Sequence, residues 1–276
     1  MVFFFLCAEA FRSIAMFLCR RLLCAAGGAS KKAAVQGYLE HLEPVSKELT
    51  PLYDLLPNEA EGTKTAYEFQ AAIIQEVIDS DPISCWKVVA PQSEGIKPFK
   101  AVDPVCGPIF HSTVLNHGAK ASLNTTGAHH IEFGLLLTIQ RADGGLISVT
   151  PAIELVGSRW PYCAPHLPGY VADLCGHCRL VVGSEAVNTN SIPSSGAVLT
   201  KNHDPQQVGY AKDALGDKLN FKRLLQLCDQ HMPSSEMACE TVKILTPAWG
   251  GRVPAKTGEY EANFGPLGKV SVTLEA

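Results

Sequence analysis

One short segment combines side chains that could bind a metal ion. His130 and Glu132 are separated by a single residue, and the dense apolar run from Ile131 to Ile139 begins between them. Alternate residues of a strand share a face, so a strand here would point the imidazole and the carboxylate the same way. A carboxylate among so many apolar residues is costly unless it is paired or metal-bound. The segment therefore indicates either a divalent metal site or an edge strand whose polar face meets water.

A second acid lies in an equally apolar setting. Glu154 falls within the strand-like run from Ala152 to Val156. It could pair with Arg159 or with another cation, or it could complete a His/Glu/Glu metal site. Oxygen ligands favour Mg²⁺ or Mn²⁺, and one imidazole shifts the preference toward Mn²⁺, Fe²⁺ or Zn²⁺.

Lys87 follows Trp86 in a short hydrophobic strand. Such a lysine is either an edge residue that extends its ammonium group to water or a cation or base aimed at a site.

Cysteines form two further patterns. Cys175-Gly176-His177-Cys178 matches the C-G-H-C string of disulfide isomerases, but the residues around it do not have the pattern of a thioredoxin fold. Cys163 and His166 precede this string and could form a structural zinc site with it. Burial of these cysteines as small apolar residues is the simpler interpretation.

The elements that must position these side chains change character along the chain. Helical spacing predicts a helix over residues 65–79, after a helical stretch over residues 31–56 that is interrupted at Pro44. Residues 84–276 then read as a strand-rich body with one helix near residues 221–228, and with an Ala142–Gly145 turn after the first long strand. Residues 184–195 are polar and predict a loop. The last two strands, residues 260–264 and 270–274, would be joined by a hairpin turn at residues 265–268.

Composition limits the class of protein. The chain has 276 residues, of which 46% are hydrophobic and 18% charged, with a net charge of −4. This is globular composition, and the mild acidity argues against a general nucleic-acid or membrane binder. We therefore expect a small-molecule or protein partner. Ten cysteines in a chain of this length indicate a reducing compartment.

We interpret residues 1–30 as a targeting sequence rather than as a part of the fold. From Met16 onward this stretch is basic, free of acids and able to form an amphipathic helix, which is the pattern of a mitochondrial presequence. We expect a mitochondrial location; the alternatives are an untargeted extension of a cytoplasmic protein and a secretory signal.

Taken in order, the motifs from Ala66 to the C-terminus resemble the 2-keto-4-pentenoate hydratase and 4-oxalocrotonate decarboxylase family of the fumarylacetoacetate hydrolase superfamily. The matching strings are Ala66-Tyr67-Glu68-Phe69-Gln70 (A-Y-x-x-Q), Trp86-Lys87-Val88 (G-W-K-I-G), Cys106-Gly107-Pro108-Ile109 (F-G-x-L), His130-Ile131-Glu132 (E-A-E), residues 152–159 (A-L-E-I-V-D-S-R), Ala172-Asp173 (the start of A-D-N-A-S), residues 180–183 (F-V-L-G), residues 243–246 (I-L-T-G) and residues 263–272 (A-x-F-G-x-L-G-x-V-x-V).

This resemblance implies an α+β fold in which an N-terminal helical region, residues 31–83, packs on a mixed strand-rich barrel or roll, residues 84–276, as one domain. It implies a metal-dependent hydratase that acts on a short 2-oxo acid or 2-hydroxydienoic acid in aromatic catabolism, such as 2-hydroxypenta-2,4-dienoate. A divalent metal would stabilise the enolate. The alternatives are a 2-oxo-acid decarboxylase, or a catalytically silent partner subunit.

The resemblance also assigns roles. His130, Glu132 and Glu154 would be the metal ligands. Lys87 would orient the substrate or assist proton transfer, Asp173 would set the charge state of Lys87, and His177 would be an additional acid–base group. We expect a homo-oligomer, and association with a related partner enzyme is a further expectation.

The chain departs from the family pattern in three places, so it is identified as a diverged member. His130 replaces a ligand carboxylate, residues 174–177 replace N-A-S-S, and Gly157 replaces the aspartate of A-L-E-I-V-D-S-R.

Overall fold

The computed structural model describes residues 59–89, 101, 103–158, 167–194, 196–215 and 220–276. The extension at residues 1–30, the helix expected over residues 31–56, Arg159, Cys163 and His166 lie outside the described residues.

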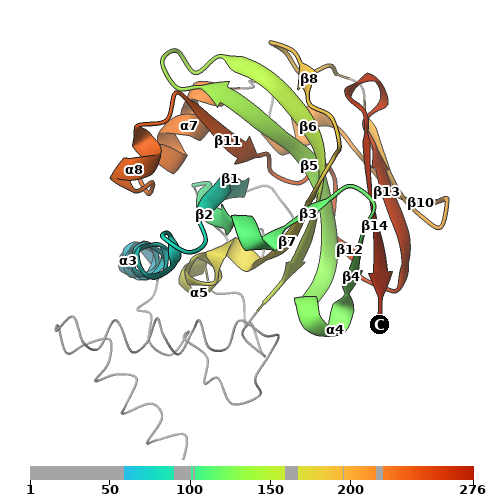
Figure 1. The fold of residues 1–276 in the computed structure, drawn as a ribbon, viewed down its shortest axis with the longest axis horizontal. Coiled ribbons are helices and arrows are strands. Elements are labelled where there is room, and N and C mark those ends of the chain that lie inside the picture. The colour runs from blue at the N-terminus through green and yellow to red at the C-terminus, as the bar shows by residue number, and fades with distance from the viewer. Residues whose placement is uncertain (1–58, 90–100, 102, 159–166, 195, 216–219) are drawn as a thin grey trace, which may run out of the picture.

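The larger of two sheets runs through the middle of the described chain and is curled (Figure 1). Its strands follow the order β2-β1-β11-β5-β6-β7-β3, with β12 paired to β5 and β8 paired to β6. The strands span Ile83–Val89 (β1), Val105–Phe110 (β2), Val114–Asn116 (β3), Ala128–Gln140 (β5), Leu146–Gly157 (β6), His177–Val182 (β7), Val187–Asn188 (β8), Thr241–Leu245 (β11) and Val253–Pro254 (β12). Because the sheet is curled, side chains from distant strands can meet on its concave side.

A smaller sheet packs beside β6 and β7 and has the order β10-β9-β13-β14-β4. Its strands span Ala119–Ser122 (β4), Ala197–Lys201 (β9), Asp204–Gly209 (β10), Gly258–Asn263 (β13) and Lys269–Glu275 (β14). Phe264, after β13, meets the rings of Phe133 and Trp249 edge to face, with centroids 6.0 and 5.2 Å away. These aromatic contacts join the two sheets through one apolar core.

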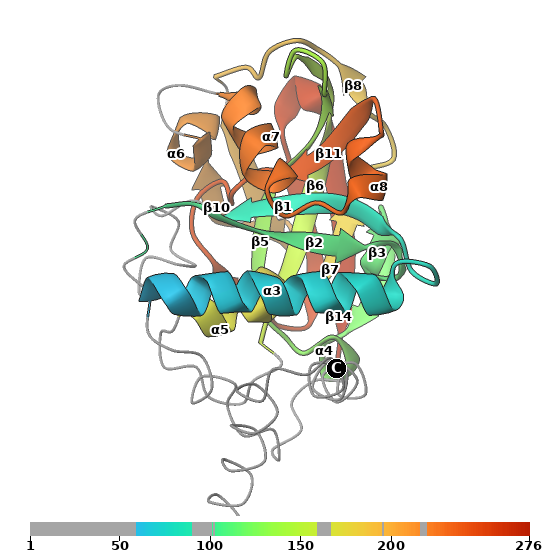
Figure 2. The same ribbon diagram turned by 90° about the vertical axis from the view of Figure 1, so that its left-hand side faces the viewer.

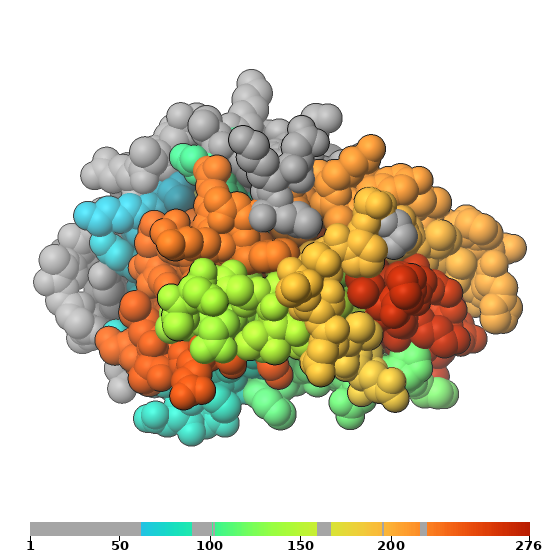
Figure 3. Space-filling model, turned by 90° about the horizontal axis from the view of Figure 1, so that it is seen from above, coloured from blue at the N-terminus to red at the C-terminus, as the bar shows by residue number. Residues whose placement is uncertain are grey.

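Helices cover the ends of the larger sheet. They span Glu59–Val77 (α3), Leu123–Thr126 (α4), Leu167–Ala172 (α5), Ala211–Leu215 (α6), Phe221–Asp229 (α7) and Ser234–Met237 (α8). In Figure 2, α3 runs alongside β2 and β1, below them in this view, with α5 packed beside it. Seen from above, the turn between β5 and β6 lies between α7–α8 and the segment that follows β7 (Figure 3). Among the described helices, none combines the length and the apolar character needed to cross a bilayer.

Polar contacts attach α3 to the body. The Tyr67 hydroxyl accepts a hydrogen bond from the Cys106 amide at 3.0 Å. The Gln70 side-chain amide donates to the Val171 carbonyl at 2.5 Å, which connects α3 to α5. The apolar face of α3, which includes Ala66 and Ile73, is buried against the core.

The predicted α+β class is confirmed, with a helix on a curled, strand-rich body. The helix expected over residues 65–79 is α3, the helix near residues 221–228 is α7, and residues 265–268 turn between the paired strands β13 and β14. The organisation of residues 31–276 as a single domain stays a prediction.

Several strands were not expected, namely β2, β3, β4, β8, β9, β10 and β12, and β8 lies within residues 184–195, which were predicted to be a loop. The Gly/Pro-punctuated stretch near Gly107-Pro108 forms β2, and it can do so because β2 is the outermost strand of its sheet, where a proline costs least. The β9–β10 hairpin turns at Asn202 and His203, both with positive φ (48° and 71°). Sequence patterns for such turns usually contain glycine, so the Asn202-His203 pair did not indicate a hairpin.

Gly157 illustrates a departure from the family motif that the packing explains. A Cβ atom at this position would lie 2.1 Å from the carbonyl oxygen of Gly127, which itself has φ +64° at the end of α4. The aspartate that the family motif carries here would therefore overlap the backbone of this chain.

We predict that Gly157→Ala lowers the thermal midpoint markedly, by about 1–3 kcal/mol of unfolding free energy, because the overlap is with backbone atoms. Gly118→Ala is the control, since its Cβ would meet open space and only its φ of +77° opposes the change. Equal midpoints for the two variants in calorimetry would contradict the described packing.

Candidate functional site

Three charged side chains stand in a row across neighbouring strands. Glu132 on β5 and Glu154 on β6 are direct cross-strand partners. On the other side of β5, Val253 of β12 pairs with Ile131, so the antiparallel register places Arg252 opposite Glu132. Directly opposed residues share a face of a sheet, and the three side chains accordingly lie on one face.

Arg252 and Glu132 form an ion pair. The Arg252 Nε atom lies 2.5 Å from Oε1 of Glu132, and the two side chains are 21% and 9% exposed. Burial opposes the charge on Arg252, but Glu132, Tyr170 and Glu154 outweigh it and hold the pKa of the guanidinium above its usual value. The second terminal nitrogen, Nη2, is buried without a hydrogen-bond partner among the described residues.

Lys87 occupies the other end of the row. It reaches from β1 to Glu154, with 2.7 Å between Nζ and Oε1, and it also donates to the Cys175 carbonyl at 3.0 Å. Lys87 and Glu154 are both almost fully buried. Burial lowers the pKa of Lys87, but Glu154 more than reverses this effect and raises it above its usual value. Glu154 thus pairs with a cation other than Arg159, as one sequence interpretation expected, and the edge-lysine interpretation of Lys87 is wrong.

His177 extends the network from the other side of Glu154. Its Nδ1 lies 2.9 Å from Oε1 of Glu154, and its Nε2 lies 2.9 Å from the Thr113 hydroxyl. That hydroxyl lies 2.8 Å from the Phe110 carbonyl, which can only accept. If the Thr113 proton goes to Phe110, both ring nitrogens of His177 must donate, and the imidazolium form satisfies every partner.

The carboxylate of Glu154 is therefore held by cationic donors. Burial alone would raise the pKa of Glu154, but Lys87 and His177 together hold it below its ordinary value. The carboxylate is ionised at neutral pH although it is only 4% exposed.

A left-handed turn positions two members of this network. Leu174, Cys175 and Gly176 have φ values of 49°, 56° and 70°. This rare run lets the Cys175 carbonyl face Lys87 and starts β7 with His177 directed at Glu154. Non-glycine residues with positive φ are strained, and such strain is concentrated at functional sites.

Two other predicted site residues lie close by. Asp173 is buried directly after α5, and its expected control of the Lys87 charge stays a prediction, because the carboxylate that pairs with Lys87 is that of Glu154. His130 is half-buried on the same face of β5 as Glu132; burial and then Arg252 lower its pKa. β5 lies between β11 and β6, so the alternative of a water-facing edge strand is wrong.

The arrangement does not fit a divalent metal in the conformation described. Within the described parts of the chain, no three His, Cys, Asp or Glu side chains come together as a metal-binding group. Glu132 is bound to Arg252 and Glu154 to Lys87, so two cations already balance the two carboxylates. A divalent ion would add two further positive charges to a buried cluster whose carboxylates are already compensated. The metal-ligand roles of His130, Glu132 and Glu154 thus stay predictions.

The C-G-H-C string does not have the setting of a redox site. Cys175 is fully buried, and burial raises the pKa of its thiol, so the reactive thiolate is disfavoured. Cys178 is also buried, and neither cysteine forms a disulfide with another described residue. The interpretation of these cysteines as buried apolar residues fits the structure.

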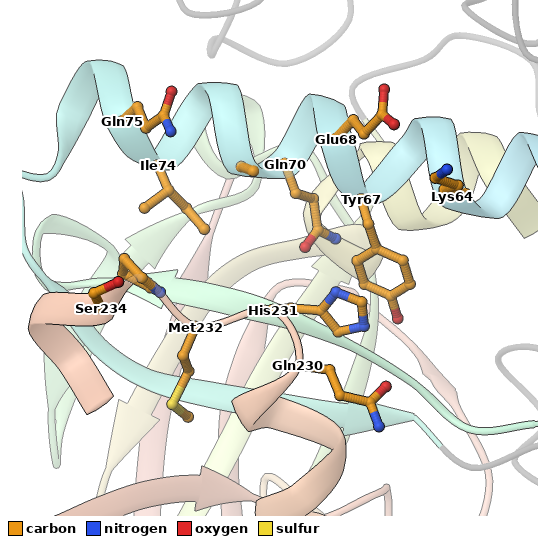
Figure 4. A pocket seen from close by; sticks show the side chains of 12 residues that line it. Lys64, Tyr67, Glu68, Gln70, Ile74, Gln75, Gln230, His231, Met232 and Ser234 are labelled. Atoms are coloured by element: carbon orange, nitrogen blue, oxygen red, sulfur yellow. The ribbon is translucent and has the colours of Figure 1, made fainter. Parts of the chain in front are cut away.

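A separate pocket of about 640 Å³ lies between α3 and the segment from α7 to α8. Tyr67 and His231 stack in it with ring centroids 3.5 Å apart (Figure 4). Gln70 and Met232 also line it, but none of its lining residues belongs to the charged row. The pocket and the charged cluster are therefore different sites.

Arg252 and Thr113 are the members of the cluster that sequence reasoning missed. Arg252 lies in Trp249-Gly250-Gly251-Arg252, within a stretch that reads as loop. Its signal is the buried Trp249, whose amide donates to Phe133 on β5, followed by Gly250 with φ +89°. These two features return the chain toward β5 and deliver Arg252 to Glu132.

We predict that Lys87→Met destabilises the protein by about 3–5 kcal/mol, because it leaves a buried carboxylate without its cation. The double variant Lys87→Met with Glu154→Gln should recover most of this loss in urea unfolding. Lys120→Met breaks a matched but exposed pair with Glu275 and should leave the midpoint unchanged. A Lys87→Met midpoint equal to that of the wild type would contradict the buried ion pair.

The lowered pKa of Glu154 also predicts a pH dependence. A carboxyl group whose folded pKa is lowered stabilises the protein above its unfolded pKa, and this contribution is lost as the pH falls through the folded value. The slope of unfolding free energy between about pH 5 and pH 3 should therefore be shallower in the Lys87→Met/Glu154→Gln protein than in the wild type. Parallel slopes in denaturant titrations would contradict the ionised state of Glu154.

Comparison with known proteins gives one relative in sequence and a group of similar folds. No protein-family model matches the chain. It is 28% identical over 263 residues to REH2-associated factor 2 of Trypanosoma brucei brucei, covering 88% of this chain and 95% of that protein.

Two solved structures have the same fold. Both are 4-oxalocrotonate decarboxylase from Pseudomonas putida G7, one with magnesium and adipate and the other with calcium and acetate. They superimpose with TM-scores of 0.72 and 0.71 at 16% identity, over 92% of this chain and 97% of theirs. The chain therefore has the fold of 4-oxalocrotonate decarboxylase, which is one of the two enzymes that its motifs resemble.

Proposed function

We propose that this chain is a protein-associating subunit that has kept a 2-oxo-acid hydratase fold and uses its buried charged cluster for structure rather than for metal-dependent catalysis. The observation that carries the proposal is the pairing of both central acids, Glu132 with Arg252 and Glu154 with Lys87. A carboxylate already bound to an internal cation is a poor ligand for a divalent ion, since the ion must first displace that cation.

The similarity to REH2-associated factor 2 also supports a protein-associating role. Its name describes a factor associated with REH2, and the match extends over nearly the whole of both chains. Association with a partner protein would use the fold as a rigid body, as expected for the catalytically silent partner subunit that is one alternative from the sequence. The mitochondrial location predicted from residues 16–30, and a homo-oligomeric state, belong to this proposal as further expectations.

The experiment combines association with activity. The full chain, tagged at its own locus, should be found in mitochondria and should co-purify in fixed proportion with the source organism's counterpart of REH2, and tagging that counterpart should recover this chain. The purified chain with millimolar Mg²⁺ or Mn²⁺ should not turn over 2-hydroxypenta-2,4-dienoate or 2-oxohex-3-enedioate in an ultraviolet assay. Turnover of either compound that is lost in Lys87→Ala would contradict a non-catalytic role, as would the absence of any stoichiometric partner.

A second candidate is the lyase that the motifs predict, a hydratase or decarboxylase of a short 2-oxo acid. One observation favours it: Lys87, Glu154, His177 and Thr113 form a continuous buried chain of hydrogen bonds. Such a chain could hold a proton near a substrate and pass it along. In this candidate Lys87 orients the substrate carboxylate, and Glu154 keeps Lys87 protonated and positions the His177 ring. The turnover assay above decides between the two candidates.

A further inference from the structure

We propose that the guanidinium of Arg252 takes the place that a divalent cation would have beside Glu132 and Glu154, so that the chain carries its own cation in the site and removal of Arg252 opens a latent divalent-metal site. This inference goes beyond the proposed function, since it concerns what fills the site and not what the protein assembles with.

The strand register brings Arg252 and the two carboxylates together. Glu132 and Glu154 are cross-strand neighbours on β5 and β6, and Arg252, directly before β12, continues the register on the other side of Glu132, so the three side chains lie on one face. Two carboxylates side by side in a buried position repel each other unless positive charge lies against them. Lys87 supplies one charge at Glu154, and Arg252 supplies the other at Glu132.

The guanidinium of Arg252 lies against one of the expected metal ligands. Its Nε contacts Glu132 directly, and its charge acts on both Glu154 and His130. These three residues are the ligand set that the sequence predicts. The cation in contact with Glu132, the predicted ligand that lies between the other two, is therefore a side chain of the protein itself.

The charge and the shape of the Arg252 guanidinium suit a place beside carboxylates. A guanidinium is always protonated and presents several N–H donors in a plane, so it can bind carboxylates as a fixed cation without depending on metal supply. Nη2 of Arg252 has no hydrogen-bond partner among the described residues, which fits a group placed by charge rather than by a complete set of hydrogen bonds. Trp249 and Gly250 fix the backbone that brings Arg252 to this place.

The test uses the full chain and Mn²⁺ as the probe, read by elemental analysis, by the electron paramagnetic resonance of bound Mn²⁺ and by thermal shift. Wild-type protein should bind no stoichiometric Mn²⁺, and millimolar Mn²⁺ should not change its melting midpoint. Arg252→Ala should melt lower, should bind one Mn²⁺ per chain at least about tenfold more tightly than the wild type, and should regain stability when Mn²⁺ is added.

Matched variants locate the ion. Arg252→Ala combined with Glu132→Gln should lose the gained Mn²⁺ binding, because one of the two carboxylates is removed. Arg252→Lys should behave as the wild type, because it keeps the positive charge. Arg141→Ala removes an arginine that pairs with Asp229 outside the cluster, so it should gain no Mn²⁺.

Two results would overturn the proposal. One is tight binding of a single Mn²⁺ to the wild type that Glu132→Gln abolishes, since Arg252 would then not occupy the place of the ion. The other is a folded Arg252→Ala protein, with a cooperative melt, that binds no Mn²⁺. Arg252→Gln removes the charge with less loss of volume, and it is measured in the same way if Arg252→Ala does not fold. None of these readouts depends on turnover or on a partner protein.

Discussion

The charged row Arg252–Glu132–Glu154–Lys87 is the constraint on which the centre of this protein depends. Two carboxylates on neighbouring strands cannot be buried together unless their charge is compensated. Here the compensation comes from two cations on elements distant in sequence, β1 and the segment before β12. The curl of the larger sheet makes this possible, because it brings β1 within reach of β6 across the concave side (Figure 1).

Several features that look unrelated follow from this requirement. The left-handed turn at residues 174–176 directs a carbonyl at Lys87 and starts β7 at His177, which then contacts Glu154. Gly250 reverses the chain before Arg252. The helix α3 supports α5 through Gln70, and the left-handed turn follows α5 after Asp173. The fold of 4-oxalocrotonate decarboxylase is thus compatible with a centre in which side chains balance the charge of the carboxylates.

Much of this architecture could be predicted from the sequence. Helix α3 and strands β1, β5, β6, β13 and β14 were predictable because each has a strong apolar period and clear boundaries. Lys87, Glu132 and Glu154 stood out because charged residues in apolar strands need a partner. Their pairing could not be predicted, since it depends on the curl of the sheet and on contacts between residues 67 or more positions apart, such as Lys87 with Glu154. Arg252 lies in an irregular segment without periodicity, so only the three-dimensional structure reveals it.

In the native protein, we expect the side chain of Arg252, and not a divalent ion, to stand against Glu132. The most direct measurement is anomalous diffraction from crystals of the wild-type chain grown with millimolar Mn²⁺ and recorded near the manganese edge. We expect no anomalous peak beside Glu132 or Glu154, and we expect electron density for the Arg252 guanidinium against Glu132. A strong peak between the two carboxylates, with Arg252 turned away from Glu132, would contradict this expectation.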